Sequence, residues 1–228
     1  MAGGTVRAER VHATREAILA AAERLFAEHG LIAVSNRQIS EAAGQGNTAA
    51  VGYHFGTKTE LIRAIVRRHT DDIERIRARM VAEAAGSANA RDWVDCLVRP
   101  NIEHLASLGS PSWFARFGAQ VMTDPELRAV MAEDSLSRPM LRQAVDGLNR
   151  CIPELPPEVR AERDEMIRQL LVHMTAERER ALADGTPTAR SSWQDAATGL
   201  TDAIVGLLLA PVTPDRDDSK ENDDESVR

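Results

Sequence analysis

The chain of 228 residues has little cysteine, and the two it has form no recognisable site. Cys96 and Cys151 stand far apart, with neither a CxxC spacing nor clustered histidines beside them. This excludes a disulfide scaffold and a zinc site as organising features, and we expect no metal and no cofactor. The opening MAGGTVRAER lacks an apolar export core, so we expect a reducing, cytoplasmic location.

Aromatic residues, β-branched runs and long apolar stretches are also scarce. Aromatics make up 4% of the chain, and no stretch reaches the roughly 18 uninterrupted apolar residues of a membrane span. Ala, Leu, Arg and Glu are abundant, and apolar positions recur at helical rather than alternating spacing. The pattern predicts an all-α fold.

The net charge of −7 argues against indiscriminate binding of nucleic acid, but the charge is unevenly distributed. Residues 1–70 carry nine Arg or Lys against six Asp or Glu, a balance of +3, which leaves −10 for the remainder. We therefore expect a polyanionic partner to bind the first third of the chain.

Capping signals divide this first third into helices. Thr14 can cap a helix that runs to about His29 and ends at Gly30. Ser35, with Gln38 three residues later, has the spacing of a capping box at the start of a second helix.

A third helix and a long fourth one follow the same logic. Gly44 closes the second helix, and Asn47 can cap a short helix that ends at about Phe55. Thr57 and Glu60 repeat the capping box. Two short helices joined by a glycine-containing turn are typical of a helix-turn-helix.

The pattern predicts an N-terminal three-helix DNA-binding domain and a larger C-terminal helical domain. The segments are a flexible basic arm (1–11), a helix-turn-helix domain (12–56), a larger helical domain (57–210) that opens with a connecting helix (57–85), and a disordered acidic tail (211–228). Further helices are expected at 91–108, 111–123, 125–150, 157–184 and 192–210, with Pro111 at a first helical position.

The stretch AVGYHFGTKTEL holds most of the residues that we expect to contact DNA. Val51 and Phe55 are four residues apart, so both can point inward. The residues left facing outward are Thr48, Ala49, Gly52 and Tyr53. Lys58 opposes the dipole of the helix that it begins, which suits a phosphate clamp, although an ordinary surface lysine is the alternative.

Other polar side chains near this stretch admit two interpretations each. Tyr53 and His54 either donate to phosphates or serve as a half-buried aromatic and a turn residue. Arg37 either reaches a guanine edge or a phosphate, or is a solvated surface arginine. The basic arm is either a source of general attraction to DNA or a disordered terminus. Its arginines are Arg7, Arg10 and Arg15.

Residues from about Thr14 to Leu61, reading TREAILAAAERLFAEHG, SNRQISEAAG and AVGYHFGTKTEL, resemble the DNA-binding domain of the TetR family of transcriptional regulators. The resemblance implies that a recognition helix begins at Asn47, Thr48 and Ala49. It also implies phosphate contacts for Tyr53, His54 and Lys58 and a base contact for Arg37. The turn GQGN is one residue longer than usual, and Gly52 stands where many members have tyrosine or asparagine.

Apolar residues of the later helices are either functional surfaces or ordinary core. A dimer interface is one interpretation of the last two long helices, because one helix-turn-helix reads only a half-site. These residues are Met166, Ile167, Leu170, Leu171, Met174, Trp193, Ala197, Leu200, Ile204, Leu207 and Leu208. The resemblance favours an effector cavity earlier in the domain. Its candidate residues are Trp93, Leu97, His104, Trp113, Phe114, Phe117, Met122 and Met140.

The predicted function is that of a homodimeric transcriptional repressor. An unknown small apolar effector would swing the helix that begins at Thr57 and release the protein from a palindromic double-stranded DNA operator. A helical interaction protein, or a DNA-binding protein without ligand response, is the alternative. The sequence has no nucleophile elbow, phosphate-binding glycine loop or His-Glu metal pair, so we predict that it is not an enzyme.

Overall fold

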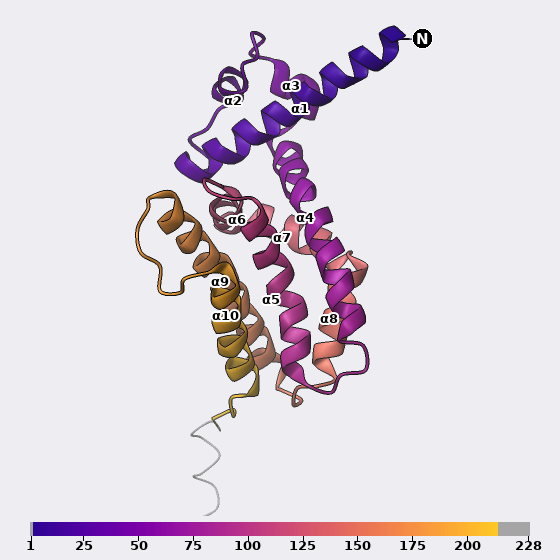
Figure 1. Ribbon diagram of the computed structural model, residues 1–228, viewed down its shortest axis with the longest axis vertical. Helices are drawn as coiled ribbons and strands as arrows, with labels where there is room; N and C mark the ends of the chain where they lie inside the picture. The colour runs from indigo at the N-terminus through magenta and orange to yellow at the C-terminus, as the bar shows by residue number, and fades with distance from the viewer. Residues whose placement is uncertain (1, 214–228) are drawn as a thin grey trace, which may run out of the picture.

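The computed structural model describes residues 2–213, except for the side chains of residues 2–5, 130, 133 and 136. Within residues 2–213 the chain forms ten helices and no strand (Figure 1), which confirms the all-α prediction. The helices are α1 Ala2–His29, α2 Asn36–Ala42, α3 Ala50–Phe55, α4 Lys58–Glu83, α5 Ala90–Ser107, α6 Phe114–Met122, α7 Pro125–Leu136, α8 Pro139–Asn149, α9 Pro157–Ala183 and α10 Trp193–Leu209. Most of the predicted acidic tail, residues 214–228, lies outside this range.

One apolar core lies at the end of the molecule where α1, α2 and α3 meet the start of α4 (Figure 1). Its fully buried side chains include Ile18, Phe26, Ile39, Val51 and Leu61. Phe117 of α6 completes this core, with its ring centroid 6.2 Å from that of Phe26. Helix α1 of the helix-turn-helix domain therefore packs directly on a helix that comes much later in the chain.

Helix α1 begins at Ala2, so the prediction that it starts at the cap Thr14 is wrong. Residues 6–13 are helical and exposed, and Figure 1 shows this part projecting past the other N-terminal helices. The stretch holds Ala, Arg and Glu, which favour helix, and lengthening an existing helix requires no new nucleation. The arm predicted to be flexible is thus helical over residues 2–11.

Helix α5 runs through the middle of the second domain, in contact with α4, α8 and α10 (Figure 1). It contains Pro100, which has no backbone N–H and leaves the carbonyl of Cys96 without its usual helical partner. The buried Arg77 of α4 supplies the missing donor, with its Nε 3.1 Å from that carbonyl oxygen. Burial lowers the pKa of Arg77 to about 10, so the side chain stays charged at neutral pH.

The helix predicted for 125–150 is two helices, because Pro139 begins a new one. Proline disfavours a helical conformation in the preceding residue, and Arg138 is extended at φ −78° and ψ 123°. The prediction that Pro111 opens a helix is also wrong, since α6 begins at Phe114.

A second core fills the space between α4, α5, α8 and α10. Trp93 is buried there and donates its indole N–H to the Ser87 carbonyl at 3.0 Å. Gly147 of α8 faces the ring so closely that a β-carbon at this position would lie 2.3 Å from it. Only glycine therefore fits beside this tryptophan without a shift of the surrounding helices.

None of the helices within residues 2–213 has the length and apolar character needed to cross a bilayer.

Candidate nucleic-acid interface

Helix α2 begins with the predicted capping box. The backbone N–H of Gln38 donates to Ser35 Oγ at 3.3 Å, and the Ser35 N–H donates to Gln38 Oε1 at 2.8 Å. Gly44, at φ +67°, ends the element in a conformation that favours glycine. The hydroxyl of Ser40 then donates to the Thr48 carbonyl at 3.2 Å, which ties α2 to the turn before α3.

Asn47 shapes that turn, although α3 itself begins later than predicted. Its Oδ1 accepts the backbone N–H of Ala49 at 2.9 Å, an Asx turn, and the regular helix starts at Ala50. Thr48 and Ala49 therefore form a turn at the head of the helix, and both are exposed.

The outward face of α3 lies bare to solvent. Val51 and Phe55 are buried, as predicted, whereas Gly52 and Tyr53 are exposed. Tyr53 is 82% exposed, which is unusual for so large a side chain. A β-carbon on Gly52 would meet no atom within 4 Å, so packing within the protein does not require glycine here. The absence of a side chain leaves this backbone open to close approach by a partner.

Arg15 is a fixed part of this unit. Its guanidinium donates to the backbone carbonyl of His54 at 2.5 Å and lies 4.3 Å from the centroid of the Phe55 ring. It holds the end of α3 against α1, so the grouping of Arg15 with a loose basic arm is wrong. The ring of His54 is half-buried and meets the Tyr53 ring edge-on at 5.0 Å.

Lys58 points into the protein, contrary to the predicted phosphate clamp. Its ammonium donates to the carbonyl of Val34 at 2.9 Å and also to that of Leu31. Burial lowers the pKa of this ammonium. The lysine thus joins the start of α4 to the loop between α1 and α2. It donates to loop carbonyls that accept no hydrogen bond within a helix.

Arg37 is exposed on α2, as predicted, and is paired with Glu41 one turn later at 2.8 Å. The hydrogen bond to Glu41 raises the pKa of Arg37. Exposed pairs of this kind contribute at most about 1 kcal/mol, so a phosphate or a guanine can compete for the guanidinium.

The residues predicted to line one effector cavity are divided between the two cores. Trp93 and Leu97 belong to the second core, whereas Trp113, Phe114, Phe117 and Met122 pack on the first. His104 lies against Phe114, and Met140 is half-buried. Helical spacing alone gave no means of telling the cores apart. An open hollow of about 440 Å³ between α5 and α10 has none of these residues in its wall; its lining is Arg99, Ile102, Glu103, Ala106, Ser107, Gln194 and Ala197.

The predicted dimer residues also separate into three groups, which are buried, exposed and half-buried. Ala197, Leu200, Ile204 and Leu208 of α10 are buried in the second core and are not available to a partner, so their assignment is wrong. Met166 and Met174 of α9 are 43% and 54% exposed. The remaining members are half-buried, namely Ile167, Leu170, Leu171, Trp193 and Leu207.

Several buried polar residues were not predicted from the sequence, among them Glu23, His69 and Glu179. Glu23 follows Leu19 by four residues and precedes Phe26 by three, so it lies on the apolar face of α1. His69 stands four residues after Ile65 and four before Ile73, both buried. A charged or polar residue within an apolar helical stripe was the signal in both cases. Among the described residues, no group of three or more His, Cys, Asp or Glu side chains is arranged so that it could hold a metal ion.

Two sequence matches decide the family. Residues 18–65 match the sequence model of the bacterial regulatory proteins of the tetR family. Residues 95–206 match that of the tetracyclin repressor-like C-terminal domain. The chain belongs to the TetR family. Its members are helix-turn-helix transcriptional regulators and not enzymes. This agrees with the predicted DNA-binding regulator and with the prediction that the protein is not an enzyme.

Individual members of the TetR family show more distant similarity. The HTH-type transcriptional repressor LfrR of Mycolicibacterium smegmatis is 28% identical over 146 residues, 63% of this chain and 69% of LfrR. The HTH-type transcriptional repressor AcnR of Corynebacterium efficiens is 32% identical over 116 residues, 51% of this chain and 55% of AcnR.

Solved structures share the fold. NalD of Pseudomonas aeruginosa, the secondary repressor of the MexAB-OprM multidrug efflux pump, aligns with a TM-score of 0.56 and 21% identity, over 90% of this chain and all of NalD. The TetR family regulator PfmR of Thermus thermophilus aligns with a TM-score of 0.51 and 19% identity, over 82% of this chain and 96% of PfmR.

Proposed function

We propose that this TetR family regulator is a homodimeric repressor that binds a palindromic operator through α3. The exposed face of α3 carries the proposal. Its inward residues Val51 and Phe55 anchor it, while Thr48, Gly52 and Tyr53 are bare. A short helix fixed from behind and uncovered in front has the form needed to enter the major groove.

The contacts to DNA follow from position and exposure. Asn47, Thr48 and Ala49 lie at the head of α3, where the first turn of a recognition helix faces base edges. Tyr53 and His54 are placed for phosphates. Arg37 joins them when DNA displaces Glu41, and Lys58 contributes by holding the neighbouring loop.

The outer face of α9 supports the dimer. Met166, Leu170 and Met174 follow one another at four-residue spacing, so they share a face, and both methionines are exposed. Ala203 and Gly206 of α10 are exposed as well. Small residues and exposed methionines allow close packing of a second copy, which would form a bundle of α9 and α10 from both chains.

Repression and release by an effector rest on the relatives and on the second domain. LfrR and AcnR are both named as repressors. Trp113, Phe114 and Met122 are half-buried on or next to α6, and the Phe114 ring meets that of the buried His104 edge-on, a combination that suits a small apolar ligand with one polar group. A ligand there would press on α6 and α4 and change the separation of the two recognition helices.

We keep the predicted ranges 12–56 and 57–210 as proposed functional divisions of the chain. Because Phe117 of α6 completes the first core, residues 12–56 alone would expose Phe26 to water. We therefore propose that both parts are needed for the DNA-binding unit to fold.

The test is selection of duplexes by the full-length protein from a random library of about 30 base pairs, together with sedimentation of the free protein and the complex. We expect a palindromic site, a dimer, and an affinity that falls steeply with salt. Absence of any selected site at modest ionic strength would instead indicate a helical interaction protein. Screening apolar compounds for release of the selected duplex distinguishes an effector-controlled repressor from a protein without ligand response.

A further inference from the structure

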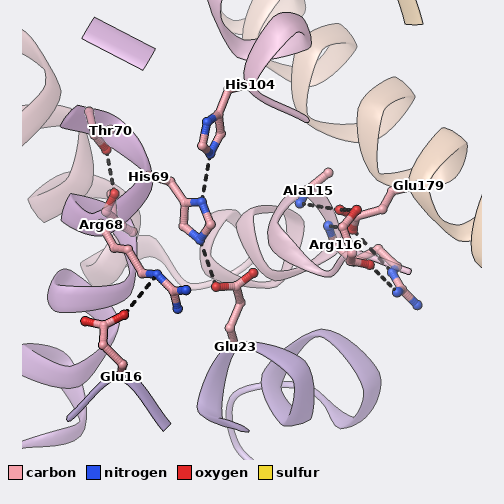
Figure 2. A network of polar contacts seen from close by, with 11 residues as sticks. Glu16, Glu23, Arg68, His69, Thr70, His104, Ala115, Arg116 and Glu179 are labelled. Carbon is pink, nitrogen blue, oxygen red and sulfur yellow. Dashed lines mark hydrogen bonds and ion pairs between the residues drawn. The ribbon is translucent and has the colours of Figure 1, made fainter. Parts of the chain in front are cut away.

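Three buried polar side chains form a chain of hydrogen bonds across three helices (Figure 2). His69 of α4 lies in the middle, with its Nε2 2.8 Å from Glu23 Oε2 of α1. Its Nδ1 is 2.8 Å from His104 Nε2 of α5. Glu23, His69 and His104 are 7%, 4% and 3% exposed. We call these three residues the Glu-His-His chain.

With His69 neutral, the donors in the Glu-His-His chain have one direction. An ionised carboxylate only accepts, so His69 Nε2 donates to Glu23. A neutral imidazole has one N–H, so His69 Nδ1 then accepts from His104 Nε2. Burial above all, and then the neighbouring His69, lower the pKa of His104 to about 4, so it is neutral at pH 7. In this arrangement each member fixes the tautomer of the next one.

The fourth helix at this place is α6. The ring of Phe114 stacks on His69, with 3.9 Å between centroids and 18° between planes, and meets His104 edge-on at 5.8 Å. A movement of α6 or α5 would therefore reach His69 directly. The Glu-His-His chain lies where α1, which belongs to the DNA-binding domain, meets the helices of the effector-binding domain.

Other charged groups near the chain lie on α1 and α4. Asp72 of α4 and Glu23 act on the charge of His104. Glu16 of α1 pairs with Arg68 of α4 at 3.4 Å (Figure 2), but both side chains are about 40% exposed. This second link between α1 and α4 is solvated, and such pairs constrain geometry weakly.

We propose that the Glu-His-His chain sets the angle of the DNA-binding helices on the effector-binding domain, and so fixes the half-site spacing that the dimer accepts. Hydrogen bonds of 2.8 Å weaken steeply when stretched or bent, so the arrangement is rigid only while all three members are engaged. Displacement of α5 or α6 breaks the hydrogen bond between His104 and His69. The His69 ring can then rotate, and its hydrogen bond to Glu23 is weakened. This inference rests on the proposed operator binding.

The experiment measures spacing preference. The wild-type duplex from the random library is remade with its half-sites one base pair closer and one base pair farther apart, and affinities are measured with full-length Glu23→Gln, His104→Gln and Glu16→Gln. Glu16→Gln is the matched control, since it alters the solvated α1 to α4 link. Wild type and control should prefer the original spacing by about tenfold or more. The other two variants should keep less than about a third of that preference.

A residue that only adds stability would lower the folded fraction and leave the preference unchanged, so retention of the full preference by folded Glu23→Gln and His104→Gln overturns the proposal. Circular dichroism establishes folding first. If these variants do not fold, Phe114→Leu, which removes the stacked ring without leaving a polar group unpaired, must show the same loss. Failure of the wild type to select any duplex would count against the proposed function and not against the role of the Glu-His-His chain.

A measurement on the wild type adds a check that needs no variant. Nitrogen-15 spectra of the histidine rings at about pH 7.5 should show His104 with its proton on Nε2. A proton on Nδ1 would reverse the direction of the chain and contradict this part of the proposal.

Discussion

The carboxylate of Glu179 on α9 accepts the backbone N–H of Arg116 at 2.9 Å, at the start of α6 (Figure 2). It also accepts from the N–H of Ala115 at 3.2 Å and from the hydroxyl of Ser112 at 2.8 Å. A carboxylate 63 residues away in sequence thus caps α6, which explains why this helix begins at Phe114 and not at Pro111.

Replacing Glu179 should therefore destabilise the protein strongly. Glu179→Ala leaves several buried donors without a partner, and we expect the free energy of unfolding to fall by about 3–5 kcal/mol. Denaturant unfolding measures this. Glu177→Ala, on the same helix with an exposed side chain paired with Arg180, should change stability by less than about 0.5 kcal/mol. Equal losses in the two variants would show that Glu179 does not cap α6.

Gly147 should not tolerate alanine. A β-carbon would lie 2.3 Å from the Trp93 ring, and we expect Gly147→Ala to lower the free energy of unfolding by about 1–3 kcal/mol. Gly118→Ala in α6 is the control, since a β-carbon there meets nothing within 4 Å. That change should be neutral or stabilise by up to about 1 kcal/mol, because alanine favours helix. Thermal unfolding measures the stability of both variants. If Gly147→Ala is no less stable than Gly118→Ala, the packing described here is contradicted.

Arg77 and Pro100 should behave as a coupled pair. In the Pro100→Ala background the restored N–H can serve the Cys96 carbonyl, so Arg77→Met should cost less there than in the wild type. We expect a coupling energy of about 1 kcal/mol from the four unfolding free energies of the double-mutant cycle. Additive effects would mean that the arginine does not replace the missing helical bond.

Tyr53 and Lys58 should differ in what their loss affects. Tyr53→Ala removes an exposed side chain, so stability should stay within about 0.5 kcal/mol while affinity for the selected duplex falls. Lys58→Ala should instead lower stability and leave the slope of affinity against salt unchanged, because its ammonium serves Val34 and Leu31. A slope reduced by about one for Lys58→Ala would restore the phosphate contact predicted from sequence.

Stability should depend on pH through His104. Its pKa is lowered to about 4, whereas an unfolded histidine takes up a proton near about pH 6.5. Above about pH 6.5 both states are neutral here, and as the pH falls from about 6.5 to about 4 the unfolded state binds the extra proton and stability is lost. The contribution is at most about 1.4 kcal/mol per pH unit. Across this pH range the unfolding free energy should fall less steeply with decreasing pH for His104→Gln than for the wild type. An identical pH dependence of the two proteins would exclude His104 as its origin.

What could be predicted from sequence were features that depend on neighbouring residues. The caps at Ser35 and Thr57 require a partner only three residues away, and both occur: Thr57 Oγ1 accepts the Glu60 N–H at 3.1 Å. At Thr57 only half of the box forms, because the Glu60 carboxylate pairs with Arg63. The break before Pro139 was also a local signal, and one that the helical periodicity around it obscured.

Features that depend on distant residues could not be predicted in the same way. Lys58 finds its carbonyl acceptors 24 and 27 residues earlier, so its inward direction depends on how α1 and α4 pack. The two cores have the same periodicity in sequence, and only the fold assigns Trp93 to one and Phe117 to the other. Burial of Ile204 and Leu208 likewise follows from the contact of α10 with α5.

The proline within α5 also has an evolutionary consequence. A lineage that acquired Pro100 without the arginine of α4 would carry a bare carbonyl inside its protein, and one that lost the arginine first would meet the same defect. We therefore expect the two positions to change together among descendants of this gene, so that an arginine at 77 should accompany a proline at 100.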